Sequence, residues 1–244
     1  MQTSLPQPET ASVLGLPLQL LDDYAGWLGD RLESGQSIHV VTLNAEMAIQ
    51  AEKDKVLEQV INRADLVIPD GAGVVFYLKL RGKRVQRCPG IELAEEMLRR
   101  SAQRGWSVFF YGGSPEVITA AATQWQQRAP GLKLLGIENG YVQADQEAAL
   151  RERLNQLQPQ LILVGLGVPR QEAWIQQHRQ LCPNSIWIGV GGSFDIWSGT
   201  KQRAPSWLRN NNLEWVYRLY KEPWRWRRML ALPVFALKAL SYRA

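Results

Sequence analysis

The sequence predicts an α/β fold in which a parallel sheet is flanked by helices. Short apolar segments of strand-like composition alternate with longer amphipathic segments over most of the chain. Most of the strand-like segments end in a turn that contains glycine, and a helical segment follows the turn. Repeated strand, turn and helix is typical of parallel sheets, so we expect a Rossmann-like architecture.

The elements of the first half can be assigned in order. Met1–Thr10 is polar and is expected to be a loose tail, and Leu20–Leu32 has the apolar spacing of a helix. His39–Leu43 predicts a buried strand that feeds a helix over Ala45–Arg63. Leu66–Ile68 predicts the next strand, which ends in a Pro-Asp-Gly turn.

The second half repeats the same pattern. Further strands are expected over Ser107–Tyr111, Gln160–Val164 and Ile186–Val190. The first of these runs into Gly112 and Gly113, after which Ser114 suits a helix N-cap and Pro115 the first helical position.

The composition changes after Gly199, where tryptophans are interleaved with arginines. Pro223 and Pro233 are expected to cut this part into short helices. We place a boundary near Thr200–Pro205. The prediction is an α/β catalytic domain over residues 1–200 and a basic helical appendage over residues 201–244.

Composition limits the class of protein. The 244-residue chain has 45% hydrophobic and 21% charged residues, which is ordinary globular usage. Cys88 and Cys182 stand far apart without ligand-like spacing, so we expect neither a disulfide framework nor a zinc site. Met1–Leu14 lacks a secretory pattern, and Met229–Leu237 is too short to span a bilayer. A cytoplasmic protein that is not integral to a membrane is therefore expected.

Charge is distributed unevenly along the chain. The net charge is +5, but residues 201–244 hold ten Lys or Arg and two Glu, so this segment carries +8 and the rest −3. The asymmetry predicts a polyanionic partner for the C-terminal segment: anionic lipid, phosphate groups or nucleic acid.

Candidate binding features gather where the predicted strands end. In an open parallel sheet, ligands bind beyond the carboxyl ends of the strands, where turns expose backbone N–H groups. The segments at such positions are Thr42–Glu46, Pro69–Gly71, Gly112–Gly113 and Gly165–Gln171. A glycine turn alone is as often a tight connection and nothing more. Gly165-x-Gly167 also lacks the complete GxGxxG of dinucleotide-binding enzymes.

Asp70 has two possible roles on position alone. Its carboxylate follows an apolar strand and can project into the crevice, where partial desolvation would raise its pKa toward that of a useful base. Alternatively it caps a helix that begins near Gly71.

Arginines could take the place of a metal ion. The sequence has no D-x-D, the acidic pair with which many nucleotide-sugar enzymes hold a divalent metal, so no metal site is expected. Guanidinium groups bind phosphate bidentately and would offset leaving-group charge. Arg218, Arg225 and Arg228 are spaced so that near-continuous helices would gather them on one face; a solvated basic face is the alternative.

Eight short motifs, taken in order, resemble those of the WecG/TagA/CpsF family, glycosyltransferase family 26, and the resemblance covers nearly the whole chain. The motifs are Thr42-Leu-Asn44-Ala-Glu46, Leu66-Val-Ile-Pro-Asp70-Gly71-x-Gly73-Val74, Arg87-Cys-Pro-Gly90, Phe110-Tyr-Gly-Gly-Ser114, Asn139-Gly-Tyr141, Gly165-Leu-Gly-Val-Pro-Arg-Gln-Glu172, Gly189-Val-Gly-Gly-Ser-Phe-Asp195 and Gln202-Arg-Ala-Pro205.

The resemblance implies an activity and a set of site residues. It implies an inverting, metal-independent transfer of a sugar such as N-acetylmannosamine from a UDP-sugar to the GlcNAc of an undecaprenyl-diphosphate lipid, with no cofactor. Asp70 would be the general base on the acceptor hydroxyl. Thr42 and Gln171 would position substrate, and Arg87 would aid binding or stabilise charge. The UDP-sugar pocket would be lined by Asn44, Gly112, Gly113, Ser114, Asn139, Tyr141, Gly167 and Asp195.

The resemblance also implies roles for particular groups at the edges of the site. Tyr141 would stack on uracil, and Asp195 would lie near the ribose or base. The appendage would close over the site and touch the inner face of the cell membrane as a peripheral anchor. Its arginines would contact the diphosphate; these are Arg218, Arg225 and Arg228.

Several alternatives stay open. Arg84 competes with Arg87, because Cys88 and Pro89 stand where less constrained residues are expected. Relatives use glucosyl, glucuronosyl or mannosaminuronosyl donors, and both a monomer and a homo-oligomer are compatible with the sequence. A nucleic-acid-binding module would explain the basic tail but not the Asp70 turn, and we expect no nucleic-acid partner. A nicotinamide-dependent oxidoreductase would explain the sheet but not the incomplete glycine fingerprint.

Overall fold

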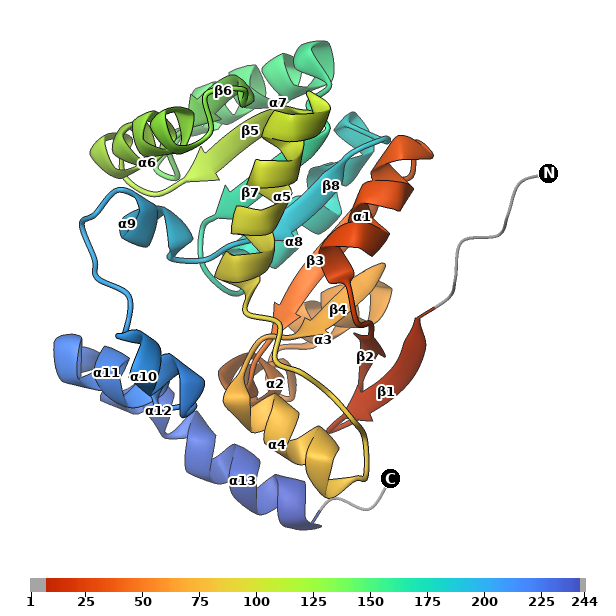
Figure 1. Ribbon diagram of the computed structural model, residues 1–244, viewed down its shortest axis with the longest axis vertical. Coiled ribbons are helices and arrows are strands. Elements are labelled where there is room, and N and C mark those ends of the chain that lie inside the picture. Colours follow the sequence, from red (N-terminus) through yellow and green to blue (C-terminus); the bar gives the residue numbers. More distant parts are fainter. Residues whose placement is uncertain (1–7, 242–244) are drawn as a thin grey trace.

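The computed structural model describes residues 8–241 and contains a six-stranded sheet with helices on both faces (Figure 1). The strand order is β4-β3-β8-β7-β5-β6, and every neighbouring pair is parallel. The strands are β3 (Ile38–Leu43), β4 (Leu66–Pro69), β5 (Ser107–Gly112), β6 (Lys133–Glu138), β7 (Leu161–Gly165) and β8 (Ile186–Gly189). The predicted α/β fold with a parallel sheet is confirmed.

Helices form a layer on each face of the sheet. One layer contains α1 (Tyr24–Glu33), α5 (Gly90–Arg104), α6 (Pro115–Arg128) and α9 (Ser193–Trp197). The other contains α2 (Ala45–Ala51), α3 (Lys55–Arg63), α7 (Ala144–Leu157), α8 (Arg170–His178) and the short η1 (Arg179–Leu181). Successive residues of β5 enter opposite layers: Phe110 packs on Phe194, while Tyr111 packs on Trp174.

A small antiparallel hairpin precedes the sheet and was not predicted. It consists of β1 (Glu9–Val13) and β2 (Leu16–Leu20), joined through Leu14 and Gly15 at positive φ. The loose tail expected over Met1–Thr10 is therefore wrong for Glu9 and Thr10, and residues 1–7 lie outside the described part. The helix expected over Leu20–Leu32 begins only at Tyr24, because the Asp23 carboxylate caps it by accepting the N–H of Gly26 at 2.8 Å.

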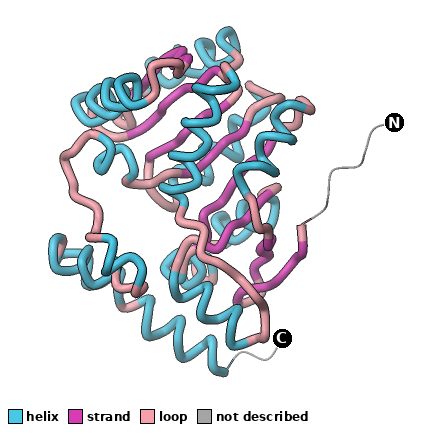
Figure 2. The backbone as a smooth tube through the Cα atoms, viewed as in Figure 1, coloured by secondary structure: helices cyan, strands magenta, loops and turns pink. Residues whose placement is uncertain are grey.

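Two further elements differ from expectation (Figure 2). The helix expected over Ala45–Arg63 is two helices, because the Asp54 carboxylate accepts the N–H groups of Val56 and Leu57 at 3.1 Å each and starts α3. Strand β6 lies at the edge of the sheet and was not predicted. Ser114 does cap α6, with Pro115 at its first position, as expected.

The C-terminal segment folds back against the body (Figure 1). Its elements are α10 (Ser206–Asn210), α11 (Glu214–Lys221), η2 (Pro223–Arg225), α12 (Trp226–Met229) and α13 (Ala231–Ser241). Helix α13 packs on α2 and on α4 (Ala72–Leu80) through Phe235 and Ala239. Pro233 does not cut this helix as expected, because it lies in the first turn, where a backbone N–H has no helical partner. Within residues 8–241, no helix is long and apolar enough to cross a membrane.

Candidate active site

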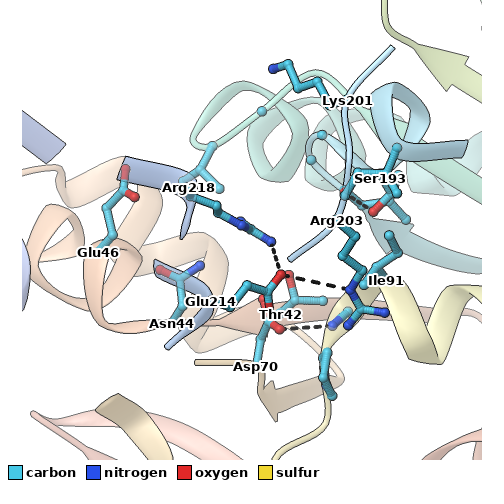
Figure 3. A pocket seen from close by; sticks show the side chains of 18 of the residues that line it. Thr42, Asn44, Glu46, Asp70, Ile91, Ser193, Lys201, Arg203, Glu214 and Arg218 are labelled. Carbon is cyan, nitrogen blue, oxygen red and sulfur yellow. Dashed lines mark hydrogen bonds and ion pairs between the residues drawn. The ribbon is translucent and has the colours of Figure 1, made fainter. Parts of the chain in front are cut away.

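A cavity of about 670 Å³ opens beyond the carboxyl ends of β3, β4, β7 and β8 (Figure 3). The body supplies one wall, from the turns that follow these strands. The C-terminal segment supplies the other wall, so the cavity lies at the junction of the two parts. Eight of the predicted site residues line it: Thr42, Asn44, Asp70, Arg87, Gly167, Gln171, Arg218 and Arg228.

Asp70 is fixed by backbone contacts at the end of β4. Its N–H donates to the carbonyl of Leu43 on β3 at 3.0 Å, and its Oδ1 accepts the N–H of Gly90, the first residue of α5, at 3.0 Å. It does not cap α4, whose N-cap is Gly71 without a side-chain hydrogen bond. Burial raises the pKa of Asp70, against the lowering effect of the Gly90 N–H and of Arg87.

Asp70 also lines a second, smaller cavity of about 140 Å³. This cavity is walled by the start of α4 at Gly71 and Gly73 and by the C-terminal segment at Trp215 and Leu232. Asp70 therefore lines both cavities.

Arg87, and not Arg84, lines the two cavities. The Arg87 Nε donates to the backbone carbonyl of Asp70 at 2.8 Å, and its Nη2 donates to Glu214 Oε2 at 2.6 Å. Arg84 is exposed and lines neither cavity.

Thr42 and Asn44 lie on the same wall. Thr42 is buried, with its Oγ1 at 3.5 Å from the carbonyl of Gly189, and the first turn of α5 packs directly against it. A Cβ on Gly90 would lie 2.7 Å from Thr42 Cγ2, which explains glycine at that position. Asn44 caps α2 by accepting the N–H of Met47 at 3.0 Å.

Gln171 holds two of the turns together. Its Oε1 accepts the N–H of Gly167 at 3.2 Å and that of Gly191 at 3.0 Å, and its Nε2 donates to Glu172 Oε1 at 2.8 Å. Gly167 has a φ of +75°, and a Cβ there would meet nothing within 4 Å, so the turn presents bare backbone to the cavity. Burial raises the pKa of Glu172 to about 7.

A second group of predicted residues lies beside the cavity without lining it. They lie at or just after the ends of β5 and β6 and comprise Gly112, Gly113, Ser114, Asn139 and Tyr141. Gly113 donates its N–H to the carbonyl of Gly165 at 3.3 Å, so this group adjoins the β7 turn. Tyr141 is 73% exposed, and its N–H donates to Asn139 Oδ1 at 2.9 Å. Asp195, on α9, contacts the cavity wall through Lys201 at 3.9 Å.

The predicted arginines of the C-terminal segment are not on one continuous helix, since α11 ends at Lys221. Arg218 and Arg228 nevertheless reach both cavities, where Arg218 pairs with Glu214 at 2.8 Å and Arg228 pairs with Glu46. The side chain of Arg225 lies outside the described part of the structure.

Other charged residues of the cavity were not predicted as site residues from the sequence; they are Glu46, Lys201, Arg203, Glu214, Lys221 and Glu222. Arg203 lies within the Gln202–Pro205 motif, which was recognised without a role being assigned to it. Glu214 is the sole buried carboxylate in the described part of the basic segment. Arg87 and Arg218 outweigh the effect of burial and lower its pKa to about 2.

A family profile and individual relatives both match the chain, and they point to the same family of enzymes. The sequence profile of the Glycosyl transferase WecG/TagA/CpsF family matches residues 11–244. The chain is 38% identical over 203 residues to the N-acetylglucosaminyldiphosphoundecaprenol N-acetyl-beta-D-mannosaminyltransferase of Bacillus subtilis, across 83% of this chain and 78% of that protein. It is 37% identical over 212 residues to the enzyme of the same name from Bacillus spizizenii, across 86% and 82%. The Staphylococcus aureus enzyme of this name is 34% identical over 207 residues, across 84% and 81%.

Proposed function

Since the chain belongs to the WecG/TagA/CpsF family of glycosyl transferases, we propose that it transfers N-acetylmannosamine from UDP-N-acetylmannosamine to the GlcNAc of a polyprenyl-diphosphate lipid. The names of the three relatives specify this sugar and this acceptor, which favours it over the glucosyl, glucuronosyl and mannosaminuronosyl alternatives. The product would serve the synthesis of a cell-surface polysaccharide.

The placement of Asp70 carries the proposal. Asp70, whose pKa is raised by burial, lines both cavities, and Arg87 and Arg218 line both of them too. The larger cavity has a volume suited to a nucleotide sugar, and the smaller one approaches Asp70 from the side of α4. Two substrates can therefore meet at one base.

The reaction is a single displacement. Asp70 accepts the proton of the acceptor hydroxyl while the hydroxyl oxygen forms a bond to the anomeric carbon of the donor. The bond from that carbon to the β-phosphate oxygen of UDP breaks, and UDP departs with its electron pair. Attack opposite the leaving group inverts the anomeric centre. Arg218 and Arg228, which line the larger cavity, stabilise the charge that develops on the diphosphate.

The donor extends from the larger cavity across the adjoining turns after β5 and β6. Gly167 lets the diphosphate approach bare backbone. We assign Asp195, which lies 3.9 Å from the cavity residue Lys201, to the ribose or base. Tyr141 is exposed at the far end of this path and is available to stack on uracil. The remaining residues proposed for the donor pocket are Asn44, Gly112, Gly113, Ser114 and Asn139.

We propose that arginines, rather than a metal ion, offset the charge of the leaving group. Activity in excess EDTA is therefore expected to equal activity with magnesium. A large loss of turnover in EDTA that added metal restores would contradict this.

A lipid-linked acceptor supports action at a membrane surface, because a polyprenyl chain does not leave the bilayer. The basic C-terminal segment, with exposed Trp224 and Trp226, suits anionic headgroups and the interface. Location on the inner face of the cell membrane is therefore part of the proposal. The inward-facing arginines and the family match argue against the nucleic-acid-binding and nicotinamide-dependent alternatives.

Replacing Asp70 by asparagine tests the function. Asn keeps an oxygen for the N–H of Gly90 but cannot take a proton, so we expect turnover of UDP-N-acetylmannosamine with a soluble prenyl-diphosphate-GlcNAc acceptor to fall about 10²–10⁴-fold. The affinity for UDP, measured by calorimetry, is expected to stay within a few-fold of wild type. Asp30→Asn, an exposed acid on α1, is the control. Near-normal turnover of Asp70→Asn would overturn the assignment of the base.

A further inference from the structure

Glu214 lies at the centre of a cluster of arginines beside Asp70 (Figure 3). Its Oε2 accepts from Arg87 Nη2 at 2.6 Å, and its Oε1 accepts from Arg218 Nη2 at 2.8 Å. Arg203 Nε is 3.9 Å from the same Oε1. Only 7% of the Glu214 side chain is exposed, so these arginines replace most of its solvent.

The cluster joins two parts of the chain that are distant in sequence. Arg87 belongs to the body, in the loop before α5, while Glu214 and Arg218 belong to α11. A parallel set of contacts lies next to it, where Glu92 of α5 accepts from Arg203 at 2.6 Å and from Arg209 at 3.4 Å. Ion pairs thus cross the junction between the body and the C-terminal segment at the mouth of the larger cavity.

We propose that Glu214 is a positioning residue: it latches α11 onto the body and holds Arg87 and Arg218 in place beside Asp70. The inference rests on the proposed function, because it assigns these arginines to the charge of the departing diphosphate. It goes further in naming the group that determines whether the C-terminal segment is docked in an active geometry.

The two arginines need the Glu214 carboxylate because their charges must be balanced in a crowded, mostly buried site. Without the carboxylate, Arg87 and Arg218 would repel each other, and each would lose a charge-assisted hydrogen bond. Arg87 would keep only its bond to the carbonyl of Asp70. The pKa of Glu214, about 2, is consistent with a carboxylate that stays ionised throughout the physiological range.

The test compares Glu214→Gln with Glu52→Gln. Glu52 pairs with Lys238 at 2.7 Å and also links the body to the C-terminal segment, but it lines neither cavity. For Glu214→Gln we expect kcat with a soluble acceptor to fall about tenfold to a hundredfold, because two charge-assisted contacts lose their geometry. Amide hydrogen exchange in α11 is expected to speed up in the same variant. Glu52→Gln is expected to match wild type in both measurements.

Two further variants separate positioning from a general loss of stability. Glu214→Asp keeps the charge and is expected to recover part of the lost kcat and part of the protection of α11. In an Arg87→Ala background, adding Glu214→Gln is expected to cost much less than it does alone, because Glu214 acts through Arg87. The proposal would be overturned if the losses of kcat in the two single variants simply added in the double variant, or if Glu214→Gln kept wild-type kcat. A rise in both UDP affinity and kcat would also overturn it, since Glu214 would then compete with the diphosphate.

The readouts distinguish this proposal from the proposed function. If the wild-type protein transfers no sugar to the acceptor, the proposed function fails, while hydrogen exchange in α11 of Glu214→Gln and Glu214→Asp still decides whether Glu214 is a latch. Unchanged protection of α11 in both variants would reject the latch.

Discussion

Glu172 determines which way the Gln171 amide points. Its Oε1 accepts from Gln171 Nε2, which leaves the amide oxygen to receive the N–H groups of Gly167 and Gly191. Glu172 Oε2 has no hydrogen-bond partner within the described structure, and the side chain is fully buried. The neutral acid is therefore the form that this environment favours.

This environment predicts how stability changes with pH. The folded-state pKa of Glu172, about 7, lies above its ordinary value of 4.5. Its contribution to stability is therefore fully present below about pH 4.5 and is lost as the pH rises through about 7, a loss of roughly 3 kcal/mol. Glu172→Gln cannot ionise, so urea unfolding between about pH 5 and about pH 8 is expected to show a flatter pH dependence in this variant than in wild type. Equal slopes for the two proteins would contradict the prediction.

The pattern of strands and turns predicted the part of the site that follows strands, whereas the resemblance of the motifs suggested Arg87, Arg218 and Arg228. Thr42, Asp70 and Gly167 stand at or just after the ends of parallel strands, so the fold alone brings them to one edge of the sheet. Glu214 does not follow a strand, so its position in the sequence did not mark it as a site residue. Its partner Arg87 is more than a hundred residues away, and an isolated acid in a basic segment looks like a solvated side chain until folding buries it.

At the scale of elements, the predicted strands share one property: they are apolar and buried on both faces. The burial pattern of β3, for example, is continuous from Ile38 to Leu43. Strand β6 was missed because Lys133–Glu138 forms an edge, is only partly buried and contains Gly136. The hairpin was missed because β1 is largely exposed and its sequence, Glu9–Val13, has no apolar run. Sequence patterns report burial and not position in the sheet, since β4 is also an edge strand but is fully buried and was predicted.

Helix α13 provides a test of how the C-terminal segment is held. Phe235 is 2% exposed, lies 6.1 Å from the ring of Tyr77 and is within 3.6 Å of the position a Cβ would take on Gly73. Phe235→Ala is expected to weaken docking by about 3–5 kcal/mol and so to raise hydrogen exchange in α13 and lower turnover on a soluble acceptor. Leu237→Ala is the matched control, because Leu237 lies on the same helix but is 69% exposed. Unchanged protection in Phe235→Ala would show that the ion pairs alone hold the segment.

At the scale of the whole molecule, the basic C-terminal segment has an inner and an outer surface. Many of its cations face the body, as the pairs of Arg203 with Glu92 and of Lys238 with Glu52 show. Its exposed apolar side chains that line neither cavity include Trp226, Leu230, Leu237 and Leu240, and we assign these to the outer surface. Exposed Phe76 and Leu80 of α4 extend the apolar character next to α13. We infer that the outer surface meets the bilayer while the inner one completes the active site.

This division predicts that membrane binding and catalysis can be separated. The variant Leu237→Ala removes exposed apolar area, and Arg227→Gln removes a cation that stacks on the Trp226 ring at 5.5 Å. Each is expected to weaken binding to vesicles of phosphatidylglycerol and phosphatidylcholine, with the cation contributing about 1 kcal/mol and the effect of Arg227→Gln shrinking as salt is raised. Turnover on the soluble acceptor is expected to stay at the wild-type level in both.

Phe235→Ala is the counterpart of these two variants, because its side chain faces the body and is expected to affect soluble turnover first. Lys238 is less suitable as a probe because it pairs with Glu52 of the body, and Arg243 lies outside the described residues. Arg227 and Leu237 are therefore the cleaner probes. Vesicle co-sedimentation and soluble turnover, measured on the same protein preparations, decide whether membrane binding and catalysis are separate. If Leu237→Ala and Arg227→Gln lowered soluble turnover as much as vesicle binding, the outer surface would be part of the folded core of the segment and not a membrane-facing one.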